Sequence, residues 1–134
     1  MSKSLIQVAN QSSQTVAVNS IISLGSVQRR FGCNCRLSGN AIEVEGQGYY
    51  AVDASVTIAP TAAGTVTVAL YCNGVQVPGA IASGATGTAG NPIALPIVAT
   101  LRQGCCCDNA DTLTLVLLAG PGTVQNVSMR VEKV

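Results

Sequence analysis

The sequence has few of the residues on which most enzymes and many binding proteins depend. It contains no histidine and no tryptophan, and only 3% of its residues are aromatic and 10% charged. Without histidine it lacks the commonest general base and the commonest neutral metal ligand. No serine or cysteine has a plausible partner base, and no glycine-rich phosphate loop precedes a helical pattern. The composition therefore argues against an enzyme, and no cofactor is predicted.

One pair of carboxylates is the remaining candidate for acid–base chemistry. Glu43 and Glu45 are two residues apart on an expected strand, so both side chains face the same side of it. Paired carboxylates can carry out acid–base catalysis. At this spacing, however, such a pair is more often a solvated strand face, and we favour that interpretation.

Long hydrophobic runs are also missing, although the chain is apolar. Hydrophobic residues make up 48% of the 134 residues, but Gly, Asn, Ser and Thr interrupt every run before the ~18 residues that a membrane span needs. The charged share of 10% is well below the roughly 25% of an average globular protein. One domain of this length has a limited interior, so the surplus apolar surface predicts burial between subunits.

Basic residues are sparse and scattered. The formal net charge is +1, and Arg29-Arg30 is the only basic doublet, with no basic run or ladder of aromatic residues around it. These features argue against nucleic acid as a partner. Residues Met1 to Ser4 have one lysine and no apolar signal core, so no secretory leader is expected.

Strand-like alternation is what the sequence has in abundance. From Tyr49 to Ile58, apolar side chains occupy every second position beginning at Tyr50. Val66 to Cys72 alternates in the same way. The Asn73-Gly74 pair that follows predicts a type I′ hairpin turn, because both residues tolerate the positive φ angles that this turn requires.

Further segments complete an all-β pattern. The return strand of the hairpin is expected at Val75–Val77, and residues 80–91 fit either a long loop or a flat strand of small residues. Pro92 and Pro96 predict that the strand at Ile93–Leu101 is an edge strand or contains a bulge. Eight or more short strands predict an antiparallel two-sheet jelly-roll sandwich; the other expected strands are Leu5–Val8, Thr15–Val18, Ile21–Leu24, Ala41–Val44, Ile93–Leu101, Thr112–Leu118 and Val127–Glu132.

Three motifs in a fixed order suggest a family. Gly48-Tyr49-Tyr50-Ala51-Val52 opens a strand directly after a short one, the Val66–Val77 hairpin follows, and Asp111-Thr112-Leu113-Thr114-Leu115 comes near the end. This order resembles the trimeric jelly roll of the tumour necrosis factor and complement globular-head superfamily. The likeness covers about residues 42–134, within a single domain of residues 1–134 whose first 40 residues hold N-terminal strands and a loop.

Two shorter segments resemble one branch of that superfamily. Val27-Gln28-Arg29-Arg30-Phe31-Gly32 and Leu37-Ser38-Gly39-Asn40 are similar to segments of its bacterial and phage members. These members are head-fibre or decoration proteins of phages and the terminal domains of collagen-like exosporium proteins. The chain begins at once with strand-like sequence and lacks a collagen stalk, which favours a capsid decoration or short head fibre over the tip of a spore filament.

The resemblance implies a homotrimer with an apolar axis. The residues it places at the subunit interface are Tyr49, Tyr50, Leu113, Leu115 and Leu117. The two tyrosines face opposite ways by alternation, so only one of them can lie directly at the interface. The alternative is that both tyrosines belong to an ordinary monomer core.

Asp53 lies in the middle of an expected strand among apolar neighbours. A buried carboxylate needs a partner, and Arg36 and Arg130 are the candidates. A solvent-facing Asp53 is the alternative.

Six cysteines are many for a chain with no secretory leader. Cys72 shares a strand face with valines and leucine, which predicts a free thiol packed as a small hydrophobe. The other five form two clusters that fit a disulfide between clusters or a soft-metal site, although their spacing departs from the Cys-x-x-Cys pattern of zinc fingers; they are Cys33, Cys35, Cys105, Cys106 and Cys107.

The function predicted from these features is a non-catalytic structural or adhesive protein. The expected site is a virion surface, where a trimeric knob made in the bacterial cytoplasm decorates a capsid or forms a head fibre. Its loops are candidates for binding a glycan or a protein on the host surface. The alternatives are a spore-surface (exosporium) protein and a soluble carbohydrate- or protein-binding module.

Overall fold

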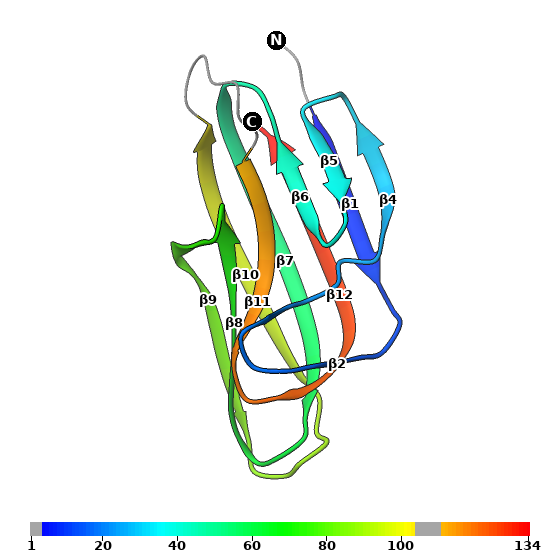
Figure 1. The fold of residues 1–134 in the computed structure, drawn as a ribbon, viewed down its shortest axis with the longest axis vertical. Coiled ribbons are helices and arrows are strands. Elements are labelled where there is room, and N and C mark those ends of the chain that lie inside the picture. The colour runs from blue at the N-terminus through cyan, green and yellow to red at the C-terminus, as the bar shows by residue number, and fades with distance from the viewer. Residues whose placement is uncertain (1–3, 104–110) are drawn as a thin grey trace.

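The computed structural model describes residues 4–103 and 111–134, which form two antiparallel sheets packed face to face (Figure 1). In sheet A the strand order is β10 (Ile93–Gln103), β7 (Gly48–Pro60), β12 (Gly122–Lys133), β1 (Leu5–Asn10) and β4 (Ser26–Phe31), with β2 (Gln14–Val16) also paired to β12. In sheet B it is β5 (Cys35–Ser38), β6 (Ala41–Val44), β11 (Asp111–Ala119), β8 (Gly64–Cys72) and β9 (Val75–Thr86), with β3 (Ser20–Ile21) on β11. This confirms the predicted fold class.

The core lies between the sheets and is built by alternation. Every second residue of β7 from Tyr50 to Ile58 is buried, and the residues between them face outward. In β12 the buried residues include Val127, Met129 and Val131, as the sequence predicts. Cys72 is half-buried against the core, which confirms its predicted packing.

The β8–β9 hairpin has the expected turn. Asn73 and Gly74 have φ angles of 53° and 83°, as a type I′ turn requires. The Asn73 side chain also ties the turn to β11, because its Nδ2 donates to Asp111 Oδ1 at 2.9 Å and its Oδ1 accepts from the Thr112 amide at 2.9 Å. Of the two possibilities for residues 80–91, a loop or a strand of small residues, the structure shows a strand as far as Thr86, where β9 ends.

The N-terminal strands pair with strands of both sheets. Strand β1 pairs with β12 on one side and β4 on the other, while β2 and β3 attach to β12 and β11. Strands β4 and β5 were not predicted, because all six residues of β4 are exposed and give no alternation of apolar side chains. Pro96 lies in β10, which pairs only with β7 among the described strands, so the predicted edge position is confirmed.

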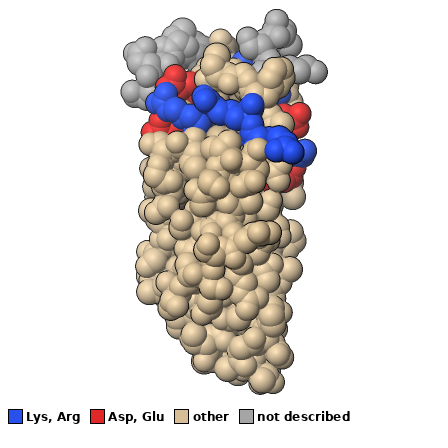
Figure 2. Space-filling model, turned by 90° about the vertical axis from the view of Figure 1, so that its right-hand side faces the viewer, with Lys and Arg blue, Asp and Glu red and all other residues tan. Residues whose placement is uncertain are grey.

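Charged residues gather towards one end of the sandwich. Residues 54–101 contain no charged side chain, and neither do residues 4–28 or 112–129. Figure 2 shows Lys and Arg as a band near one end with Asp and Glu beside it, while the rest of that face is uncharged. In the described ranges, 4–103 and 111–134, we find no helix long and apolar enough to span a bilayer.

Candidate interaction surface

The five residues predicted to lie at a subunit interface occupy two different environments. Leu113, Leu115 and Leu117 have no exposed surface, and Tyr50 is 1% exposed. A side chain enclosed within its own chain offers no atoms to a neighbour, so the structure corrects the prediction for these four and makes them core residues. Tyr49 is 54% exposed and is available for contact; its interface role stays a prediction.

Tyr50 anchors a loop that the sequence did not reveal. Its hydroxyl donates to the carbonyls of Glu45, at 2.8 Å, and Gly46, at 2.9 Å. Asn34 Nδ2 donates to the same Glu45 carbonyl at 2.7 Å, and the Ser4 hydroxyl donates to Asn34 Oδ1 at 2.6 Å. Burial raises the pKa of Tyr50 to about 12, so it stays neutral at ordinary pH.

The outward side of sheet A, here called the A face, is the most extensive candidate surface. Strand register aligns its outward residues in rows that cross β10, β7, β12, β1 and β4. The middle row consists of Val98, Asp53, Arg130, Gln7 and Arg29. Arg130 Nη2 lies 2.6 Å from Asp53 Oδ2, with the two side chains 49% and 47% exposed. Asp53 is therefore solvent-facing in the single chain and not buried, and its partner is Arg130 rather than Arg36, which pairs with Glu43.

The next row towards the uncharged end is made of small side chains. It runs through Pro96, Ser55, Ser128, Ala9 and Ser26 in continuous register. Because none of these side chains is long or charged, another surface can approach this part of the sheet closely at little desolvation cost.

The row on the other side of the ion pair is more apolar. It contains Thr100, Ala51, Glu132, Leu5 and Phe31. Phe31 is 63% exposed, and Val98 in the middle row is 69% exposed. Together with Tyr49 these side chains give the A face large apolar contacts at several points.

The outward side of sheet B, here called the B face, carries a second ion pair. Arg36 Nη2 lies 2.6 Å from Glu43 Oε1 and 3.3 Å from Glu45 Oε1. The Arg36 side chain donates a hydrogen bond to Glu43 and is 55% exposed. This exposure agrees with the solvated strand face favoured for Glu43 and Glu45. Elsewhere this face is rich in threonine; Thr67, for example, shares a hydrogen bond with Ser83 at 2.9 Å.

Of the two predicted cysteine clusters, the structure describes Cys33 and Cys35. Cys33 is exposed, whereas Cys35 is buried, and both are free thiols. Burial raises the pKa of Cys35 to about 11, an effect that the nearby charges of Arg30 and Lys133 reduce. Cys105, Cys106 and Cys107 lie outside the described residues, so the disulfide and metal predictions that include them stay predictions. Within residues 4–103 and 111–134, no three potential ligands of the His, Cys, Asp or Glu type lie close enough to hold a metal.

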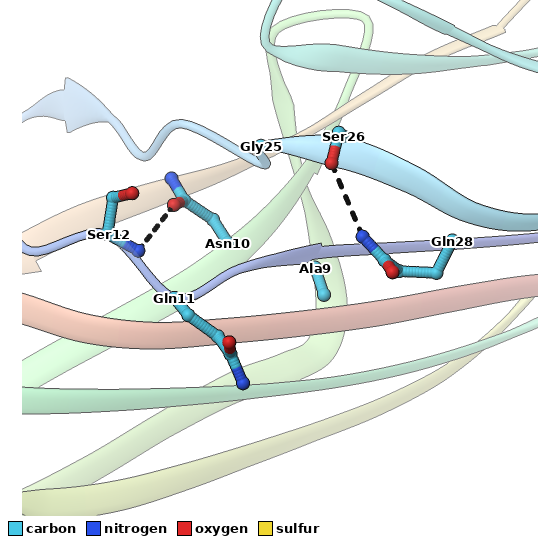
Figure 3. A pocket seen from close by; sticks show the side chains of 7 residues that line it. All are labelled: Ala9, Asn10, Gln11, Ser12, Gly25, Ser26 and Gln28. Carbon is cyan, nitrogen blue, oxygen red and sulfur yellow. Dashed lines mark hydrogen bonds between the residues drawn. The ribbon is translucent and has the colours of Figure 1, made fainter.

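A polar groove of about 480 Å³ lies where β1 ends and β4 begins (Figure 3). Asn10 is fixed there, because its Oδ1 accepts from the Ser12 amide at 2.9 Å and its Nδ2 donates to the Ser23 carbonyl at 3.2 Å. Gln28 donates to the Ser26 hydroxyl at 3.3 Å. Amides and hydroxyls with no formal charge suit a neutral polar ligand; the lining residues are Ala9, Asn10, Gln11, Ser12, Gly25, Ser26 and Gln28.

Comparison with known proteins assigns the fold. No protein-family model and no curated protein matches the sequence. Among solved structures, murine APRIL matches with a TM-score of 0.76 and 9% identity over 99% of this chain and 100% of that one. Eiger TNF from S. frugiperda (0.71, 11%, 98% and 91%) and the globular domain of zebrafish complement 1qA protein (0.69, 8%, 94% and 94%) also match.

These comparisons and the strand order define the class: a jelly roll of the kind found in tumour necrosis factor-like proteins and complement globular heads. The resemblance read from the sequence is confirmed at the level of the fold. At identities of 8–11% the likeness concerns the fold alone, so the surface of this chain has to carry the functional argument.

Proposed function

We propose that this protein is a non-catalytic homotrimeric binding module on the surface of a particle, and specifically a decoration or head-fibre knob of a phage capsid. The observation that carries the proposal is the A face. It combines exposed Phe31, Tyr49 and Val98 with a row of small uncharged side chains on a rigid sheet. A surface built in this way is suited to burial against another protein surface.

The charges on the A face follow the pattern of an interface with a polar rim. Arg29 is on β4 at the edge of the sheet, and Arg102 is close to the described end of β10. Asp53 and Arg130 lie in the middle of the sheet, where they neutralise each other, and Glu132 lies in the next row on β12. Interfaces are depleted of charged residues in their core and tolerate them at the rim.

The amino-acid composition also favours a trimer. With 48% hydrophobic and 10% charged residues, one domain of 134 residues has more apolar surface than its interior uses. Closed cyclic assembly buries such surface without leaving an open end for fibre growth. The threefold symmetry is what the resemblance to trimeric jelly rolls implies.

Attachment to a phage particle is supported by the two segments that resemble the bacterial and phage branch. Residues 27–31 lie in β4 and residues 37–38 end β5, and the two strands are linked by a hydrogen bond of 2.9 Å from Arg30 Nε to the Cys35 carbonyl. The test is immunogold labelling of intact virions with antibody against the purified protein, with spores of the same host as the comparison. Gold on virion heads is expected. Gold on spores alone would contradict the capsid location and assign the protein to the spore surface.

The polar groove favours a second candidate function, a carbohydrate-binding module. Its amides and hydroxyls match the hydrogen-bonding groups of a neutral sugar, although it lacks the aromatic platform that most sugar sites have. Titration with neutral hexoses and N-acetylhexosamines, followed by NMR shifts, tests it. Shifts that Gln28→Ala abolishes and Gln76→Ala on β9 leaves intact would support this function, and unshifted spectra would remove it.

A further inference from the structure

We propose that the Asp53–Arg130 pair is the specificity element of self-association: it selects a second copy of this chain as the occupant of the A face and fixes how the copies align. This inference rests on the proposed trimer. The pair joins the two central strands β7 and β12 and lies in the middle of the face, so any copy that covers the face also covers the pair.

The geometry of the pair is already complete within one chain. Arg130 Nη2 and Asp53 Oδ2 are 2.6 Å apart between directly opposed residues of adjacent strands. With each side chain about half exposed in the single chain, such a pair contributes little to folding, because water screens it. When a second surface covers it, the two charges lose water but keep each other, whereas either charge alone would be enclosed without a partner.

The surroundings of the pair make it selective. Val98 is beside Asp53 on β10, and Ser55 and Ser128 form the next row, so on these sides the pair borders uncharged side chains, while Glu132 lies beside Arg130 in the row on the other side. A covering surface must therefore offer polar groups over the pair and apolar or small groups next to it on the uncharged side. A misaligned copy would place apolar atoms over the two charges, and this penalty excludes alternative alignments.

Self-association explains the pattern better than an unrelated partner does. The pair is neutral as a unit, so it provides no net attraction for a charged partner surface, and the apolar and small groups that a cover requires are present on the chain's own exposed surface. Val98 and Pro96 supply them on the edge strand β10.

The test uses charge-removing variants and a matched control. Asp53→Asn and Arg130→Gln each leave one unpaired charge on the A face. Glu43→Gln breaks the equivalent pair on the B face, which has the same 2.6 Å separation between opposed strand residues. The half-dissociation concentration of each trimer is measured by light scattering over a dilution series, and thermal unfolding confirms that each variant is folded.

We expect Asp53→Asn and Arg130→Gln each to raise the half-dissociation concentration about 100-fold or more, and Glu43→Gln to change it less than about 3-fold. The exchanged variant Asp53→Arg/Arg130→Asp restores a neutral pair and should recover most of the wild-type value. Wild-type dissociation constants in both single variants would overturn the inference while leaving the proposed trimer intact. A wild-type protein that is monomeric throughout would instead overturn the trimer itself.

Discussion

The outward faces of the two sheets each have a cross-strand ion pair with an N–O separation of 2.6 Å, but the pairs have different surroundings. On the A face, Asp53 and Arg130 are on the central strands of the sheet, with Val98, Ser55 and Ser128 beside them and Glu132 in the next row. On the B face, Arg36 and Glu43 are on β5 and β6 at the edge, with Glu45 as a further partner. The two ion pairs therefore have the same local geometry but different positions. Asp53–Arg130 lies where another surface can cover it, and Arg36–Glu43 lies at a solvated sheet edge.

The largest expected effect comes from placing an unpaired charge on each face in turn. Val98→Glu puts an anion in the middle row of the A face directly opposite Asp53, and burial of a charge without a partner costs several kcal/mol. Ile81→Glu puts the same charge on the outward side of β9. Light scattering should show that Val98→Glu is a 13.5 kDa monomer and that Ile81→Glu keeps the wild-type mass. Dissociation of Ile81→Glu without dissociation of Val98→Glu would contradict the comparison between the faces. Loss of the trimer in both variants would extend the interface to the β9 side.

A smaller effect should separate the core from the faces. Leu115 has no exposed surface, so Leu115→Ala should lower the free energy of unfolding by about 2–5 kcal/mol through lost burial and a residual cavity. Urea denaturation at a concentration where the chains are monomeric measures this. A cost below about 1 kcal/mol would contradict the buried position.

The neighbouring tyrosines offer a matched test of inside against outside. Tyr50→Phe removes the donor to the Glu45 and Gly46 carbonyls and should cost about 1–3 kcal/mol of stability. Tyr49→Phe, on the A face, should change stability by less than about 0.5 kcal/mol. Denaturant midpoints compare the two variants, and equal losses would argue that Tyr49 is held in the fold as firmly as Tyr50.

The smallest effect is a dependence on alkaline pH. Burial raises the pKa of Cys35 from 9.0 to about 11 and that of Tyr50 from 10.0 to about 12. In these ranges the unfolded chain releases protons that the folded chain retains, so these two groups leave stability unchanged well below about pH 9 and lower it as the pH rises from there. Cys35→Ala should reduce this fall between about pH 9 and about pH 11. A wild-type denaturation midpoint that does not change over this range would contradict the raised pKa values.

Alternation in the sequence was enough to predict the sheets but not every role within them. It identified the buried side of β7 and the turn at Asn73-Gly74, because both depend on neighbouring residues. It also showed that Leu113, Leu115 and Leu117 share one side, but alternation alone does not say whether that side faces the core or a neighbour. The resemblance led to the wrong choice for these leucines.

The missed features depend on contacts between distant segments. Val98 and Phe31 belong to β10 and β4, which lie on opposite edges of sheet A, so no local pattern indicates that they share a face. The loop network joins Ser4, Asn34 and Glu45, which are far apart in the sequence. By contrast, Arg130 could be named as a partner for Asp53, because an opposite charge in a predicted strand was one of few candidates; the β7–β12 register confirms it.

The solution mass of the wild-type protein tests the central claim most directly. Light scattering with and without reductant should give about 40 kDa, three times the 13.5 kDa of one chain, because the proposed trimer forms through the A face and needs no disulfide. A mass of 13.5 kDa at all concentrations would contradict the account and make the groove-based binding module the better description.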